Sequence, residues 1–298
     1  MPKLHRLSLL ASTALLALPS RTTAANELID PAALGFGFAG YTLDITGQPS
    51  ADYEDRAGGY EAIETRVIAP FYQWQPGDWI VGASVNYAWH HADFGGGFGL
   101  GRKDLHAIDL QMVAAWRPEN SRWWALTFVS PGLNTDFESI GSDSFTISAL
   151  GLLGYKVTPT LDLALGVGAG YSLRDARVLG ALGLIWRPND QWILQLTPPI
   201  IAIGWRPDRQ WTIAAVAYPG GESWEVAETA DGVRQVNLDL WRAALSVEYR
   251  IGDHWRAGAR AGVSFGGELE LRDSDARVLS SSDLETAPFA ALAVRWAF

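Results

Sequence analysis

Hydrophobic and polar residues alternate along most of the chain from residue 33 onward. In residues 255–271 the odd positions are mostly apolar, from Trp255 to Leu271, whereas the even positions hold Arg256, Arg260 and small or acidic residues. Successive side chains of a β-strand point to opposite sides of the sheet. The pattern therefore predicts strands with one apolar and one polar face, and it continues to the last residue.

The alternation divides into segments that we expect to be strands. Fourteen are recognised: 33–46, 59–73, 79–92, 104–116, 122–131, 143–157, 160–173, 177–187, 191–197, 199–206, 210–218, 235–250, 255–271 and 284–298. Pro198-Pro199 leaves the strands on either side short, so an arrangement without this hairpin, with twelve strands, stays open. In 235–250 the apolar phase slips between Leu240 and Trp241, which predicts a β-bulge.

The connections alternate in length. One set is tight and rich in Pro, Gly, Asp or Asn, as such turns require, for example 158–160 and 252–255. The other set is longer, with more Gly and acids, for example 93–103 and 219–234. Short periplasmic turns and longer extracellular loops are typical of outer-membrane barrels. The sequence therefore predicts an all-β fold, a single closed antiparallel transmembrane β-barrel of about fourteen strands.

The unequal size of the two faces indicates which one meets lipid. A barrel of this strand number is too wide for side chains to fill, so we expect the bulky apolar face to point outward and the small and charged residues to point inward. No segment after residue 20 approaches the ~18–20 apolar residues that a membrane helix needs.

Tryptophan is frequent, with 14 residues in the chain, and most of them lie at strand ends beside the tight turns. Indole rings prefer the headgroup level of a membrane. We therefore expect a girdle formed by Trp74, Trp79, Trp116, Trp124, Trp186, Trp192, Trp205, Trp211, Trp255 and Trp296. The alternative interpretation is that these rings close one end of a soluble barrel.

The N-terminus has the form of a secretion signal. Lys3 and Arg6 precede an apolar stretch at 7–18, and small residues follow, which predicts a signal peptide at 1–25 and a barrel domain at 26–298. Its removal takes away three basic residues and no acids, so the net charge falls from −10 to −13. This acidity excludes a typical nucleic-acid partner, and the absence of cysteine excludes a disulfide scaffold.

Several turns and the last strand carry a family resemblance. Leu-Thr-Pro-Pro-Ile at 196–200 leads into Trp-Arg-Pro-Asp-Arg-Gln-Trp at 205–211, and Arg-Ile-Gly-Asp-His-Trp follows at 250–255. With these features the chain resembles the porin-like outer-membrane β-barrel proteins of Gram-negative bacteria that are grouped as a domain of unknown function. The resemblance implies fold and location and no activity. The terminal Phe298 resembles the aromatic residue that the barrel-assembly machinery recognises.

Charged residues on the predicted inward face are candidates for lining an aqueous channel. They are Arg66, Asp109, Asp162, Arg242, Glu248, Arg256, Arg260, Glu268 and Arg295. The local excess of arginine on the last three strands predicts selection of anionic solutes. A salt-bridged network that only stabilises a narrow barrel is the alternative, and both stay open.

Histidine offers little chemistry. His90 and His91 are adjacent, so they face opposite sides of a strand, and with His106 they predict no metal site. Ser84 and Asn86 share the inner face with His90, but no set of nucleophile, base and orienting group is recognisable. We expect no catalytic residues and no cofactor.

The first hypothesis is a passive channel for small solutes. One alternative is a structural or surface-interaction barrel with a closed lumen. The other is an outer-membrane enzyme, which is less favoured because no catalytic triad is recognisable. Expected partners are outer-membrane lipid, lipopolysaccharide, the assembly machinery and small solutes. No loop of plug size is visible, and acidic loop residues such as Glu222 and Glu225 are expected to be solvated, with cation bridges to lipopolysaccharide as the other reading.

Overall fold

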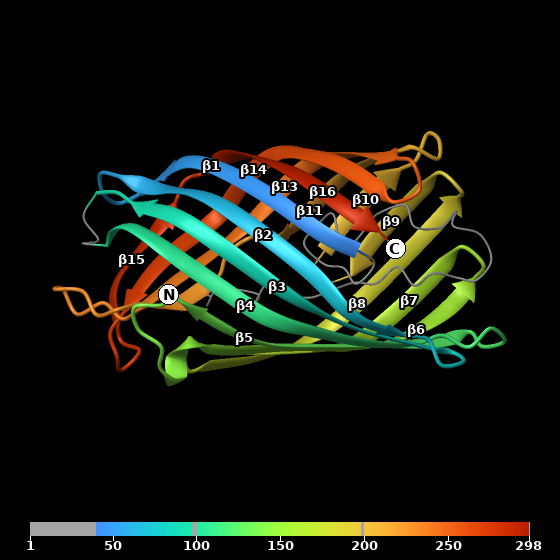
Figure 1. The fold of residues 1–298 in the computed structure, drawn as a ribbon, viewed down its shortest axis with the longest axis horizontal. Helices are drawn as coiled ribbons and strands as arrows, with labels where there is room; N and C mark the ends of the chain where they lie inside the picture. Colours follow the sequence, from blue (N-terminus) through green and yellow to red (C-terminus); the bar gives the residue numbers. More distant parts are fainter. Residues whose placement is uncertain (1–39, 97–99, 198–199, 298) are drawn as a thin grey trace, which may run out of the picture.

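The computed structural model describes residues 40–96, 100–197 and 200–297, which form an elongated β-barrel (Figure 1). Its strands are β1 (Gly40–Asp52), β2 (Gly59–Trp74), β3 (Trp79–Phe94), β4 (Gly101–Trp116), β5 (Trp123–Thr135), β6 (Phe145–Thr158), β7 (Leu161–Ser172), β8 (Asp175–Asn189), β9 (Trp192–Thr197), β10 (Ile200–Trp205), β11 (Trp211–Pro219), β12 (Ser223–Glu225), β13 (Gln235–Ile251), β14 (Trp255–Arg272), β15 (Val278–Leu284) and β16 (Ala287–Ala297). A 3-10 turn, η2, covers Ser142–Ser144. The predicted signal peptide, Pro198-Pro199 and Phe298 lie outside the described residues.

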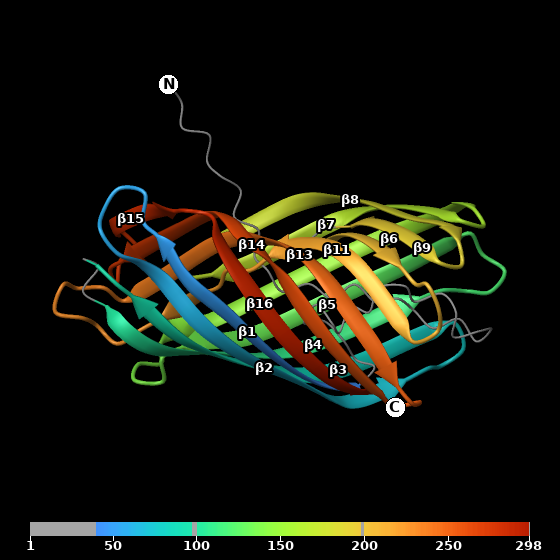
Figure 2. The same ribbon diagram turned by 90° about the horizontal axis from the view of Figure 1, so that it is seen from above.

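The strands close into a ring of fourteen, which confirms the predicted fold class. Each of β1 to β11 pairs antiparallel with its neighbours, β13 pairs with β11 and β14, and β15 and β16 together form the last strand beside β14. β16 also pairs with β1 along Gly40–Gly47, and Figure 2 shows β16 between β1 and β14. The short strands β9 and β10 belong to the ring, so the twelve-stranded alternative is excluded.

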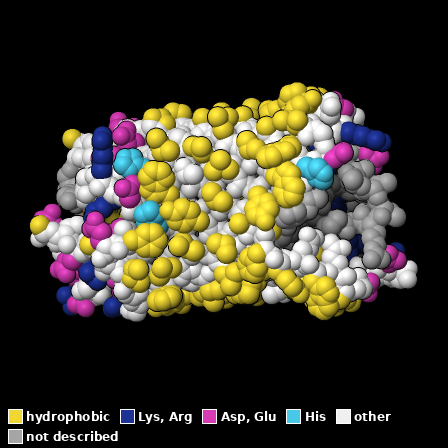
Figure 3. All heavy atoms as spheres, in the orientation of Figure 1, with side chains coloured by type: hydrophobic (Ala, Val, Ile, Leu, Met, Phe, Trp, Pro, Cys, Tyr) yellow, Lys and Arg dark blue, Asp and Glu magenta, His cyan; other side chains and the backbone are white. Residues whose placement is uncertain are grey.

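Apolar side chains cover the outside of the barrel. Leu182 is 79% exposed and Leu292 is 68% exposed. In Figure 3 hydrophobic side chains spread across the middle of the visible face, and charged side chains gather at its two ends. An exposed apolar band of this kind is what a lipid-facing barrel surface requires. None of the helical segments in the described part of the chain is long and apolar enough to cross a membrane.

The wall changes in its outer half, where the longer loops lie. β12 continues the line of β11 along β13, and one parallel bridge joins its Glu225 to Thr135 of β5. The backbone amide of Asp136 also donates a hydrogen bond to the Glu225 carbonyl, at 3.3 Å. Strands β12 to β16 and β1 to β5 therefore close a smaller inner ring. The outer parts of β6, β7 and β8 (145–150, 168–172 and 175–183), which we call the flap, lie outside this ring.

Two separate apolar cores match this division. The outer core lies within the inner ring, with Tyr60, Phe94, Trp224, Leu238 and Leu269 among its buried members. The second core draws mainly on β4 to β11, and its bulkiest members are Trp124, Leu126, Phe128, Leu150, Leu152, Ile193, Ile200, Val216, Tyr218 and Phe289. The expectation that only small and charged residues point inward is therefore wrong, because both cores are made of bulky apolar side chains.

The interruption that was predicted between Leu240 and Trp241 is present in the β13–β14 ladder. The register shifts there so that Leu240 faces both Gly266 and Gly267. The extra residue therefore belongs to β14 and not to the segment where the phase slip is seen. Gly266 has a φ of 59°, in the left-handed region that favours glycine.

The bulge exchanges the two faces of β14. Beyond Gly266 the side chains of Leu269 and Leu271 are buried in the outer core. Glu268 alternates with them and faces away from that core, opposite Asp239 of β13. The prediction that Glu268 lines the lumen is therefore corrected: one inserted residue moves it to the other face.

Replacing Gly266 by alanine should destabilise the barrel by about 1–2 kcal/mol, the cost of a left-handed conformation for an L-residue. No atom lies within 4 Å of the added Cβ, so the effect comes from the backbone alone. The measurement is urea unfolding in detergent micelles. Gly258→Ala, on the same strand and without a positive φ, is the control and should change stability little. Equal effects of the two substitutions would contradict the assignment of the bulge.

Candidate functional site

Arginine side chains gather on the inner face of β14 and β16. Arg256 donates from Nη1 to Glu248 Oε1 at 3.2 Å, and Arg295 Nη2 lies 3.9 Å from Glu248 Oε2. Arg260 forms an ion pair with Asp44 of β1. Three guanidinium groups thus lie against the carboxylates of Glu248 and Asp44. We call these five residues the arginine wall.

Small residues make room for the arginine wall. Gly258, Ala291 and Ala293 alternate with the arginines on the inner face of β14 and β16, and they line a small cavity together with the three arginines and Glu248. The side chains of Thr42 and Ser246 complete the lining. The arrangement places guanidinium and hydroxyl groups, which can donate hydrogen bonds to an anion, on the lining of one cavity.

A second charged cluster lies at the border between the inner ring and the wide part of the barrel. Arg66 Nη2 lies 2.8 Å from Glu64 Oε1 and 3.1 Å from Glu222 Oε1. His90 Nε2 approaches Glu222 Oε2 at 3.1 Å, and Arg242 Nη1 lies 3.3 Å from Glu64 Oε2. Four of these residues come from strands, whereas Glu222 belongs to the connection between β11 and β12. The cluster, which we call the latch, holds that connection inside the barrel.

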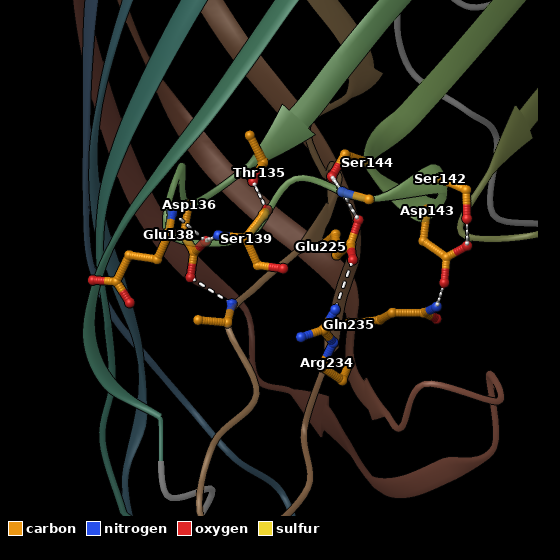
Figure 4. A network of polar contacts seen from close by, with 12 residues as sticks. Thr135, Asp136, Glu138, Ser139, Ser142, Asp143, Ser144, Glu225, Arg234 and Gln235 are labelled. Atoms are coloured by element: carbon orange, nitrogen blue, oxygen red, sulfur yellow. Dashed lines mark hydrogen bonds and ion pairs between the residues drawn. The ribbon is translucent and has the colours of Figure 1, made fainter.

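The seam between β12 and the β5–β6 connection is also polar (Figure 4). Ser144 donates from Oγ to Glu225 Oε2 at 2.6 Å, and Arg234 donates from Nη2 to Glu225 Oε1 at 3.1 Å. Beside them, Gln235 donates from Nε2 to Asp143 Oδ2 at 2.9 Å. These charge-assisted bonds fix the bridge that closes the inner ring.

The segment 219–234 therefore differs from the solvated loop that the sequence predicts. Glu225 is 4% exposed, and Glu222 is paired within the latch. Trp224, which is 1% exposed, and Val226 belong to the outer core. These apolar residues between the acids are the sequence feature that could have indicated a buried connection.

Most of the predicted lumen-lining residues point into the barrel, but not into one site. Arg66 and Arg242 belong to the latch, and Glu248, Arg256, Arg260 and Arg295 belong to the arginine wall. Asp109 accepts hydrogen bonds from Asn86 Nδ2 (2.7 Å) and Ser130 Oγ (2.5 Å). Asp162 pairs with Arg187 at 3.0 Å, near the tight turns. Their part in solute passage stays a prediction.

The tryptophans of the predicted girdle lie at the surface with one exception. Trp124 is 8% exposed and points inward, where its ring occupies the space that a Cβ on Gly154 would take. Its neighbour Trp123 is the exposed residue of the pair. Exposed members of the girdle are Trp74, Trp79, Trp186, Trp192, Trp205, Trp211 and Trp255, and half-buried ones are Trp116 and Trp296.

The side chains of His90, His91 and His106 lie in three different surroundings. His90 is buried in the latch, whereas His91 is exposed beside Asp104, 2.8 Å from Nδ1 to Oδ1. His106 stacks on Phe137, on the outer face of β4. Among the residues that the structure describes, no group of three or more histidine and acidic side chains could hold a metal ion.

Residues 75–297 match the model of a protein family described as a domain of unknown function, DUF6268. The chain belongs to this family, as its turns and last strand indicate. Among the curated proteins no sequence matches the chain.

Solved structures share the barrel fold at low sequence identity. A NanC porin is similar over 86% of this chain and 100% of its own, with 10% identity and a TM-score of 0.42. The toluene transporter TodX of P. putida covers 91% and 94%, with 12% identity and a TM-score of 0.41. A Pseudomonas aeruginosa FadL homologue covers 87% and 89%, with 10% identity and a TM-score of 0.41. Likeness at this level concerns the fold.

The substitution Glu222→Gln should loosen segment 220–234, because it removes the negative charge that faces Arg66 and His90 in the buried latch. Hydrogen exchange measured by mass spectrometry in micelles should show faster uptake in this segment. The matched control is Glu228→Gln in the same segment, where the side chain is exposed. Unchanged exchange in the Glu222 variant would contradict the latch.

Proposed function

We propose that the protein is an outer-membrane barrel of Gram-negative bacteria that lets small solutes pass passively. Cleavage of residues 1–25, assembly through Phe298, and contact with lipid and lipopolysaccharide are parts of this proposal. The observation that carries it is the arginine wall, a charged cavity lining inside a ring of fourteen strands. Charged side chains on the wall of a pore select solutes by the sign of their charge.

The opposite inner wall suggests what kind of solute fits. Phe128, Leu152, Ile193 and Val216 belong to the apolar core of β4 to β11, whereas the arginine wall lies on β13, β14, β16 and β1. These apolar side chains are 5% exposed or less, so a solute would have to part them, and it would then meet guanidinium groups on one side and apolar side chains on the other. Small organic anions with an apolar part match this pair of surfaces best.

A barrel with a closed lumen is the second candidate, and one observation favours it. The outer core fills the inner ring, and the latch ties segment 219–234 across it. Buried apolar side chains therefore occupy the inside of the inner ring, where a solute would have to pass. A structural or surface-contact role would need no such passage.

Conductance across planar bilayers distinguishes the two candidates. Protein purified from outer membranes should give steady channels, with a reversal potential in asymmetric potassium chloride that indicates anion preference. Replacing both Arg256 and Arg260 by glutamine should lower the anion-to-cation permeability ratio several-fold, because it removes two positive charges from the cavity lining. A folded protein that never conducts would support the closed barrel.

Two further variants control the selectivity measurement. Glu248→Gln leaves the arginines in place and removes an acid from the wall, so it should raise anion preference. Arg102→Gln changes an exposed residue near the outer rim and should have little effect. Selectivity that follows none of the wall variants would contradict the proposed role of the arginine wall.

A further inference from the structure

In the part of the chain that the structure describes, the barrel wall is incomplete beside the outer part of β8. On one side β8 pairs with β7 from Asp175 to Trp186. On its other side β9 pairs only with the lower part of β8, between Leu184 and Asn189. Among the described residues, the short hairpin of β9 and β10 therefore leaves 175–183 as an edge with a strand on one side.

A polar crevice lies behind this edge, between the flap and the outer face of the inner ring. One part is lined by Ser172, Asp175 and Arg177 of the flap and by Asn237 and Asp239 of β13, with further residues of β12 and β14. A second part shares Ser172, Ser223 and Asp239 and extends to Asp109 and Ser130 on the inner wall, with about 570 Å³ of unfilled space, some of it open to solvent.

The unpaired edge requires surroundings other than lipid. Lipid cannot satisfy backbone amides and carbonyls, so an open strand edge is tolerated at membrane depth only where it is buried in protein or lines a water-filled cavity, and the polar crevice lies beside this edge. The outer face of the same stretch is apolar, with Val178 71% and Leu182 79% exposed. A polar cavity therefore meets a lipid-facing surface along β8.

One polar side chain in the crevice has no hydrogen-bond partner among the described residues, and another has no ion-pair partner among them. The hydroxyl of Ser172 is buried and has no hydrogen-bond partner within the described structure. Asp239 makes no ion pair with any described residue, and its contact is an amide, Asn237 Nδ2 at 3.3 Å. The guanidinium groups of Arg177 and Arg272 that line the crevice are paired with Asp175 and Glu270.

The charge around Asp239 favours a cation. Asp239 lies directly opposite Glu268 in the β13–β14 ladder, and Glu268 lies opposite Asp283 in the β14–β15 ladder. A bound ammonium group would compensate the charge of Asp239, and it would donate hydrogen bonds to Asp239 and Ser172, which line the same crevice.

We propose that the crevice between the flap and β13 binds the head group of an amphiphile that carries a primary amine, with its apolar tail in the lipid along Val178 and Leu182. The amine donates to the Asp239 carboxylate and the Ser172 hydroxyl. The tail leaves through the gap above β9 and β10. The site does not depend on conduction through the barrel.

Electron paramagnetic resonance of spin-labelled probes in phosphatidylcholine vesicles tests the site. The probe is a nitroxide-labelled long-chain alkylammonium. The control probe is a fatty acid with the same chain length and the same nitroxide label. The amine should be motionally restricted by the protein much more than the acid. Asp239→Asn should weaken amine binding about tenfold, as the loss of a charge-assisted hydrogen bond implies. Glu61→Gln, an exposed change at the rim, should not alter it.

Labelled phosphatidylethanolamine, tested in the same way, identifies the source of the amine. If the protein restricts the motion of this lipid, the ligand comes from the surrounding membrane. If it restricts the single-chain amine alone, the ligand comes from the medium. Either result supports the site if it is lost in the Asp239 variant. Equal restriction of amine and acid, or binding that survives Asp239→Asn, would overturn it.

A sealed crevice provides a test that is independent of Asp239. The described chain has no cysteine, so cysteines introduced at Arg177 and Asn237, which line the same cavity, can be joined by a reducible bis-thiol reagent. The cross-linked protein should lose the restricted amine signal and regain it after reduction. Undiminished binding by the cross-linked protein would also overturn the proposal.

Discussion

Lipid offers no hydrogen-bond partner, so the backbone of each strand that crosses a membrane has to be paired within the barrel. In this protein the strands are closed into a ring at two levels of the barrel. In the wide part, the pairing of β1 with β16 and of β13 with β14 closes fourteen strands. In the outer half, the bridge between Glu225 and Thr135 closes a smaller ring, and five strands, β6 to β10, are left out of it. The flap follows from this second closure, and the shortness of β9 and β10 leaves the edge of β8 unpaired among the described residues.

The second closure depends on burying charges in pairs. A carboxylate removed from water is costly unless cations and donors surround it. Glu222 lies against Arg66 and His90, and Glu225 accepts from Ser144 and Arg234. Apolar residues of the same segment fill the space between these contacts. The acids and the apolar residues together turn a connection of sixteen residues, 219–234, into part of the wall and core.

The sequence was sufficient for the architecture because the period of two is local. Expected strands such as 79–92 agree with β3, Trp79–Phe94, to within two residues. The inner ring could not be predicted, because its bridge joins residues 135 and 225, far apart in the chain. Apolar side chains suit both a lipid-facing surface and a protein core. The sequence therefore does not indicate that Leu238 and Leu269 point inward. For the adjacent Trp123 and Trp124, alternation left open which ring faces lipid.

Only some residues of the candidate site could be predicted from the alternation in the sequence. Arg256, Arg260 and Arg295 fall on the inward face because their strands alternate without interruption up to that level. Glu268 lies beyond Gly266, where one extra residue reverses the faces, and its interpretation changed accordingly. Ion pairs such as Glu222 with Arg66 join separate parts of the chain, and no spacing rule reveals them.

The most direct test of the account is a cross-link across the inner ring. Cysteines at Thr135 and Glu225, which are bridge partners, lie within the range of Cα separations that a disulfide spans. The account predicts that this pair oxidises readily in the folded, membrane-inserted barrel, in a chain that has no other cysteine. If the outer half instead kept the full ring, five strands would separate the two positions. Folded barrels that fail to form the disulfide would then contradict the second closure.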